Sequence, residues 1–216
     1  MSGDISTAIS MFTAATDYAF GAGFEDEIEW QKNIEFHNFS ESDLLRESAW
    51  VILCSGFKEQ IVRSVFDYIS LCFCDWESAE EIVKADPFCR ISALSAFRNS
   101  AKLEAISRCA EKIYFEGFES VKRQIFLSPL SYLQEFDFIG PVTAKHLAKN
   151  LGMNIAKPDR HLFRLSECFG FRDADHLCSE LARVTGEKKN VIDLIIWRYF
   201  AGCHESKLWL VGNNFA

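Results

Sequence analysis

The feature that most constrains the fold is the spacing of apolar residues, which recur every three or four positions along most of the chain. This spacing places apolar side chains on one face of an α-helix, whereas the two-residue alternation of a half-buried strand is scarce. We therefore predict an all-α protein of about ten to twelve helices joined by short loops. The segments that follow the helical pattern are Ile5–Phe20, Leu44–Cys54, Ile61–Phe73, Lys102–Phe115, Thr143–Leu151 and Val191–Ala201.

The chain has 216 residues, of which 49% are apolar and 25% are charged, so it can bury a sizeable core and resembles ordinary globular proteins. Its longest apolar segment is interrupted by Asp193 and Arg198, and none reaches the roughly 18 to 20 residues that span a bilayer. The N-terminus has no basic leader followed by an apolar run, so we expect no secretory signal and no membrane partner.

Eight cysteines occur, and most of them fall within helical apolar patterns, where a free thiol behaves as a small apolar group. No C-x2-C pair is present, and no set of four has the spacing of zinc or iron–sulfur ligands. We expect reduced, buried thiols in a cytoplasmic protein. The cysteines are Cys54, Cys72, Cys74, Cys89, Cys109, Cys168, Cys178 and Cys203.

The net charge of −8 argues against nucleic-acid binding, but the charge is unevenly distributed. Residues 1–48 carry ten acidic residues against Lys32 and Arg46, a net charge of −8. Residues 141–172 carry six basic residues against Asp159 and Glu167, a net charge of +4. This basic region is either a solvated face or a surface that contacts phosphates, and the charge pattern alone leaves both interpretations open.

A turn between two helices leads into this region, at Phe136-Asp137-Phe138-Ile139-Gly140-Pro141-Val142-Thr143-Ala144. Gly140 can adopt backbone conformations that other residues avoid, and proline suits the first position of a helix. The free N–H groups of that helix start could bind a phosphate oxygen. The alternative interpretation is a plain helical hairpin.

A second segment follows, Lys157-Pro158-Asp159-Arg160-His161-Leu162-Phe163-Arg164. Pro158 cannot continue a preceding helix, and Asp159 stands where the N-cap of a helix over Arg160–Phe169 belongs. The positive end of that helix favours an ionised carboxylate. Taken alone, Asp159 is better explained as a helix cap than as a catalytic residue.

These segments resemble the helix-hairpin-helix DNA glycosylase superfamily, the HhH-GPD group. Residues 136–144 align without gaps to its hairpin, L-P-G-V-G-x-K-T-A, and residues 159–164 match its D-x-H-x-x-R segment. Weaker matches lie at residues 97–102, against Y-x-x-K-A, and at residues 53–57, against L-L-S-x-Q. The resemblance implies a two-lobed helical fold with the active site in the cleft between the lobes. One lobe would span residues 44–154, with the helix-hairpin-helix at about 130–151; the other would combine residues 1–43 and 155–216.

The resemblance also implies an activity, base excision from double-stranded DNA, with Asp159 as the catalytic residue. Val142 occupies the position of the lysine with which bifunctional relatives attack the sugar, and valine cannot form a Schiff base. We therefore expect a monofunctional enzyme that flips out a damaged or modified base, hydrolyses its N-glycosidic bond and leaves an abasic site. Lys145, about one turn further along, leaves a bifunctional glycosylase/lyase as an alternative. Phe138 replaces the first hairpin glycine, which is a departure from the family pattern.

Other expectations come from the same resemblance. Phe57 is the candidate wedge into the base stack, although a core role explains it at least as well. His161 is more simply explained as a packed core residue. The hairpin carbonyls could hold a monovalent cation, K⁺ or Na⁺; we expect no other cofactor, no metal bound by side chains and no iron–sulfur cluster. Trp30, Phe36 and Trp50 are candidate pocket walls, although a plain core role explains each of them better. The candidate DNA-contacting residues are Gly140, Val142, Thr143, Lys145, Phe57 and Arg160.

Two further classes of function remain open, a non-catalytic helix-hairpin-helix DNA-binding protein and a purely structural helical domain. Within the glycosylase hypothesis the excised base is also open: alkylated purines, deaminated or mismatched bases, oxidised guanine and bulky modified cytosines all fit. The last would suit defence against foreign DNA rather than DNA repair of the cell's own genome. We expect a monomer that is cytoplasmic and associates with the nucleoid when it is bound to DNA.

Overall fold

The computed structural model describes residues 3–213, and the side chains of residues 3–210. All regular structure in this range is helical, which confirms the all-α prediction. The range contains thirteen α-helices and two 3₁₀ helices, slightly more than predicted. The excess comes from short helices, because so few residues cannot display a helical period. Examples of 7, 6 and 5 residues are α5 (Ala79–Ala85), α6 (Phe88–Ala93) and α9 (Pro129–Leu133).

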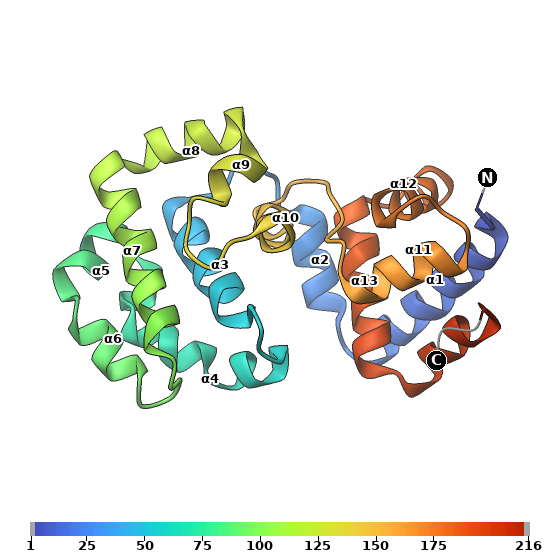
Figure 1. The fold of residues 1–216 in the computed structure, drawn as a ribbon, viewed down its shortest axis with the longest axis horizontal. Coiled ribbons are helices and arrows are strands. Elements are labelled where there is room, and N and C mark those ends of the chain that lie inside the picture. Colours follow the sequence, from blue (N-terminus) through green and yellow to red (C-terminus); the bar gives the residue numbers. More distant parts are fainter. Residues whose placement is uncertain (1–2, 214–216) are drawn as a thin grey trace. The chain divides into compact units, whose positions relative to one another are not determined.

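The chain divides into two compact units (Figure 1). The first unit combines residues up to Phe36 with those from Gly152 onward, so it is built from both ends of the sequence. Its helices are α1 (Ile5–Gly21), α2 (Glu25–Asn33), α11 (Arg160–Cys168), α12 (Ala174–Thr185), α13 (Lys189–Gly202) and the 3₁₀ helix η2 (His204–Asn213).

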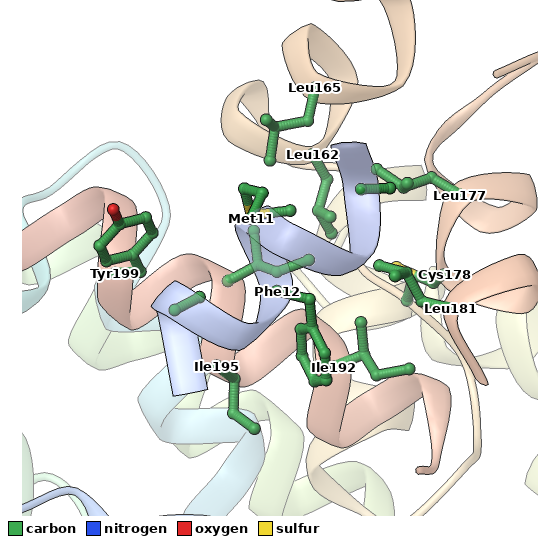
Figure 2. Packing of buried hydrophobic residues seen from close by; sticks show 14 of the residues in the cluster. Met11, Phe12, Leu162, Leu165, Leu177, Cys178, Leu181, Ile192, Ile195 and Tyr199 are labelled. Carbon is green, nitrogen blue, oxygen red and sulfur yellow. The ribbon is translucent and has the colours of Figure 1, made fainter. Parts of the chain in front are cut away.

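Helix α13 is the centre of the first unit, since α1, α2, α11 and α12 all pack against it. It is buried on nearly all sides, and its apolar residues therefore surround the helix instead of forming one stripe. Figure 2 shows Phe12 of α1 and Ile192 of α13 lying side by side in this core. The same cluster includes Met11, Leu162, Leu165, Leu177, Cys178, Leu181, Ile195 and Tyr199.

The second unit spans His37–Leu151 and is continuous in sequence. Helix α7 is its centre and packs against α3, α5, α6 and α8, while α10 packs against α9 and α3. The helices are α3 (Glu41–Cys54), α4 (Glu59–Cys72), α5 (Ala79–Ala85), α6 (Phe88–Ala93), α7 (Ser100–Glu116), α8 (Phe118–Leu127), α9 (Pro129–Leu133) and α10 (Pro141–Asn150), with the 3₁₀ helix η1 (Cys74–Trp76).

The unit boundaries differ from the expected lobe boundaries, which lay between residues 43 and 44 and between residues 154 and 155. The ring of Phe39 packs edge-on against Phe118 and Phe126 of α8, so the segment before α3 belongs to the second unit. At the other boundary, Gly152 approaches the backbone of Phe36 so closely that it belongs to the first unit.

Side-chain caps begin many of the helices. At Ser40 the hydroxyl accepts from the Asp43 amide while the Asp43 carboxylate accepts from the Ser40 amide, a reciprocal pair that fixes the start of α3. Within residues 3–213 no helix combines the length and apolar character needed to cross a membrane. Further side-chain caps are Asp4, Ser78, Asn99, Asp159 and Asp173.

Candidate functional site

Asp159 caps helix α11 in the first unit, as its position after Pro158 predicts. Its Oδ1 atom accepts from the backbone amides of His161 at 2.8 Å and Leu162 at 3.0 Å. Among the hydrogen bonds of residues 3–213, none reaches the other carboxylate oxygen, Oδ2. The side chain is half-buried, with Oδ1 held by the helix end and Oδ2 without a hydrogen bond to the described residues.

The loop that leads to Asp159 is anchored on helix α13. The Lys157 amide donates to Oδ2 of Asp193 at 2.9 Å, and the Asn190 amide lies 3.4 Å from Oδ1 of Asn154. Asp193 is only 1% exposed, so this carboxylate is part of the interior and holds the loop from inside the unit. In the sequence Asp193 is visible only as an acidic interruption of an apolar segment, and its partner, the Lys157 amide 36 residues earlier, is identified only by the structure.

His161 lies beside Asp159 and packs its ring against Phe200 of α13, with 5.7 Å between ring centroids. Burial lowers the pKa of His161; Asp159 acts in the opposite direction, and Arg160 and Arg164 lower the pKa further. The imidazole is therefore neutral near pH 7, which suits a packed side chain and a hydrogen-bond acceptor. The exposed Arg160 extends along this surface, with its Nε 3.4 Å from Nε2 of His161.

The predicted hairpin forms in the second unit, between α9 and α10. Pro141 is the first residue of α10, and the Gly140 amide donates to the Thr143 hydroxyl at 2.6 Å. The amides of Val142 and Thr143 lie in the first turn of α10, where the helix itself supplies no carbonyl partner. The start of α10 can therefore offer two N–H groups to an anion such as a phosphate oxygen.

The unusual backbone of the hairpin is not at Gly140, where the sequence suggested it. Gly140 has φ −94° and ψ −173°, an extended conformation that any residue adopts. The left-handed position is Phe138, with φ +62°. The turn is tied to α7 through its neighbour, since Nε of Arg108 donates to Oδ2 of Asp137 at 2.5 Å.

The remaining hairpin candidates have mixed exposure. Val142 is exposed, and Lys145 is half-buried one turn further along α10. Lys149, which contributes to the basic region of the sequence, is buried and therefore does not belong to a solvated basic face. Phe57 follows α3 in the same unit and is 40% exposed.

The three aromatic residues proposed as pocket walls lie in different units. Trp30, on α2, and Phe36, just after it, belong to the first unit; Trp30 is exposed and Phe36 is half-buried. Trp50 belongs to the second unit, where its ring meets that of Phe66 edge-on at 5.0 Å. The guanidinium of Arg63 covers the Trp50 ring at 5.3 Å, so Trp50 takes part in a local packing cluster.

The described residues contain no group of three or more His, Cys, Asp or Glu side chains that could hold a metal ion. None of the eight cysteines, all within the described residues, forms a disulfide; Cys89, Cys109 and Cys178 are buried, and the others are only half-buried, which differs from the expected burial of all of them.

Comparison of the chain with models of protein families, with curated proteins and with solved structures finds no match.

Proposed function

We propose that the protein is a monofunctional DNA glycosylase of the helix-hairpin-helix type. In this proposal the hairpin before α10 grips the backbone of double-stranded DNA, and Asp159 acts at the sugar of an extruded nucleotide. The observation that carries the proposal is the carboxylate of Asp159, with Oδ1 fixed by two amides and Oδ2 unoccupied. A cap alone needs only the first of these two oxygens.

The chemistry follows from the charge that develops at the sugar. When the bond between C1′ and the base nitrogen breaks, its electron pair leaves with the base and positive charge spreads over C1′ and the ring oxygen. A carboxylate held in place stabilises this charge without having to reorganise. Water then adds to C1′ and gives up one proton, and the base, which left with the bonding electron pair, gains one, so the products are the free base and an abasic site.

The hairpin supports the proposal on the binding side. The amides of Val142 and Thr143 begin α10, and the turn before them is braced by Thr143 and Arg108. Such a rigid start can hold a phosphate at little entropic cost. Lys145 and Arg160 are the candidate contacts to flanking phosphates, which would make binding dependent on salt.

The first test is the substitution Asp159→Asn. Asparagine caps helices about as well as aspartate, so α11 should remain folded, while base release should fall about 10²- to 10³-fold or more. The matched control is Asp173→Asn, because Asp173 caps α12 in the same unit through the His176 amide at 2.8 Å. The control should excise at the wild-type rate.

The assay is mass spectrometry of free bases released from duplexes that carry alkylated, deaminated, mismatched, oxidised or bulky modified bases. Release of no base from any of these duplexes, or release by Asp159→Asn at the wild-type rate, would overturn the proposal. Strand nicking measured with and without alkali tests whether the enzyme is monofunctional, as Val142 in place of the lysine predicts. Nicking without alkali that disappears in Lys145→Ala would show that the enzyme is bifunctional.

A further inference from the structure

Phe138 has a backbone conformation that its residue type does not favour. Its φ of +62° lies in the left-handed region, where a β-carbon crowds the following carbonyl and where glycine or asparagine is normally found. A bulky residue held there costs free energy, and such strain often marks a functional position. Contacts of the Phe138 side chain must therefore stabilise this conformation.

Burial in the core does not supply that stabilisation. The residues at the two anchor points of the turn, Phe136 and Ile139, are buried, and they fasten it to the unit. The Phe138 ring between them is 43% exposed. Phe138 therefore has an unfavourable backbone conformation and is still largely exposed to solvent.

What lies against the ring is an ammonium group. Nζ of Lys102, on α7, lies 4.7 Å from the centroid of the Phe138 ring and 5.6 Å from that of Phe57. Lys102 is 3% exposed, and its Nζ donates to the carbonyl of Ile52. One buried cation is therefore shared by two half-exposed rings from different loops of the same unit, through attraction to their π-faces.

The Phe57 ring is held from a second side. It packs at 5.0 Å and at a tilt of 52° against the buried ring of Phe97. Both rings are thus positioned before any ligand arrives, which reduces the ordering cost of binding. Their exposed parts are flat and apolar, and Phe138 lies three residues before Pro141, where α10 begins and offers amides to a phosphate.

We propose that Phe57 and Phe138 form a stacking site for an unpaired nucleobase of DNA. A nucleobase fits because it is a flat π-system joined to a phosphate, which matches rings beside free amides. The site rests on the proposed function, which supplies both DNA as the partner and the extrusion that leaves a base unpaired. It binds the base left unpaired opposite the extruded nucleotide or the abasic product.

The decisive variant is Phe138→Gly, because glycine relieves the left-handed backbone and the turn should keep its shape. Phe138→Asn is a second variant, since asparagine also tolerates this conformation. The probe is a duplex that carries a tetrahydrofuran abasic analogue opposite 2-aminopurine. Both variants should bind this probe about tenfold or more weakly than wild type, with little change in affinity for the intact duplex. The 2-aminopurine fluorescence change seen with wild type should shrink in parallel.

The matched control is Phe115→Ala, which removes a highly exposed phenylalanine from the end of α7 in the same unit. It should bind the probe as wild type does. Wild-type affinity for the abasic probe in both Phe138 variants would overturn the stacking site and leave the glycosylase proposal intact if Asp159→Asn is inactive. Weaker probe binding by the Phe138 variants, with Asp159→Asn fully active, would support the stacking site and overturn the glycosylase proposal.

Discussion

At the scale of single residues, two carboxylates, those of Asp159 and Asp193, fix the geometry of the candidate site. Asp159 closes the first turn of α11 with one oxygen and keeps the other oxygen free. Asp193 is an interior carboxylate that fixes the Lys157 amide, two residues before Asp159. The position of Asp159 is therefore determined from both sides, by the helix that it begins and by the loop that leads to it.

Lys102 gives a pH-dependent prediction at the same scale. Burial lowers its pKa to about 8, against an ordinary value of 10.5, and Cys54 acts weakly in the opposite direction. Because the folded protein favours the neutral amine, the unfolded chain binds more protons between these two values, and folding stability rises with pH across that window. The free energy of unfolding of wild type should therefore increase relative to Lys102→Met from pH 8 to pH 10.5, by up to about 3 kcal/mol.

Urea unfolding of both proteins at several pH values measures this difference. All other titrating groups are common to the two proteins and cancel in the comparison. Parallel stability curves over this window would show that Lys102 keeps its ordinary pKa in the folded protein.

At the scale of elements, the turns between helices have backbone conformations that are as well defined as those of the helices. The turn before α10 places its left-handed residue at Phe138, while Gly140 is extended. Gly152, just after α10, has φ +98°, and a β-carbon there would lie 2.6 Å from the amide nitrogen of Phe36. A side chain at this position would therefore push apart two segments that are far apart in the sequence.

We predict that Gly152→Ala destabilises the protein by about 1–3 kcal/mol more than Gly23→Ala does. Gly23 also has positive φ, +81°, but a β-carbon there meets nothing within 4 Å. The two variants share the backbone strain, so their difference isolates the contact with Phe36. Thermal or urea unfolding checks it; equal losses of stability would mean that the close approach relaxes without cost.

At the scale of the whole molecule, the two units have different relations to the sequence. The second unit is one continuous segment, whereas the first must bring α1 and α2 together with α11, α12 and α13. Loss of packing in the first unit should therefore destabilise helices from both ends of the chain.

Leu162→Ala tests this prediction, because Leu162 is fully buried in the core of the first unit. The cavity should cost about 2–5 kcal/mol. Hydrogen exchange should then speed up in α1 and α13 together, while the amides of α7 in the second unit keep their protection. Equal loss of protection in α7 would show that the chain unfolds as a single cooperative body.

The sequence by itself determined the all-α class, several of the long helices and the cap of α11. The segment Ile5–Phe20 became α1 (Ile5–Gly21), and Asp159 caps α11 as expected. These features follow from neighbours within one or two helical turns, and their pattern is therefore visible in the residue order. Proline at the start of α10 is a signal of the same local kind.

Only the tertiary structure decided which residues of the hairpin are strained, which charges are buried and where the units divide. The left-handed conformation of Phe138, the burial of Lys102 and the anchor from Asp193 all depend on side chains or backbone from other helices. Such contacts join residues that are distant in the sequence, so no local pattern encodes them. That is the physical reason why the cap at Asp159 was predictable while the loop anchor behind it was not.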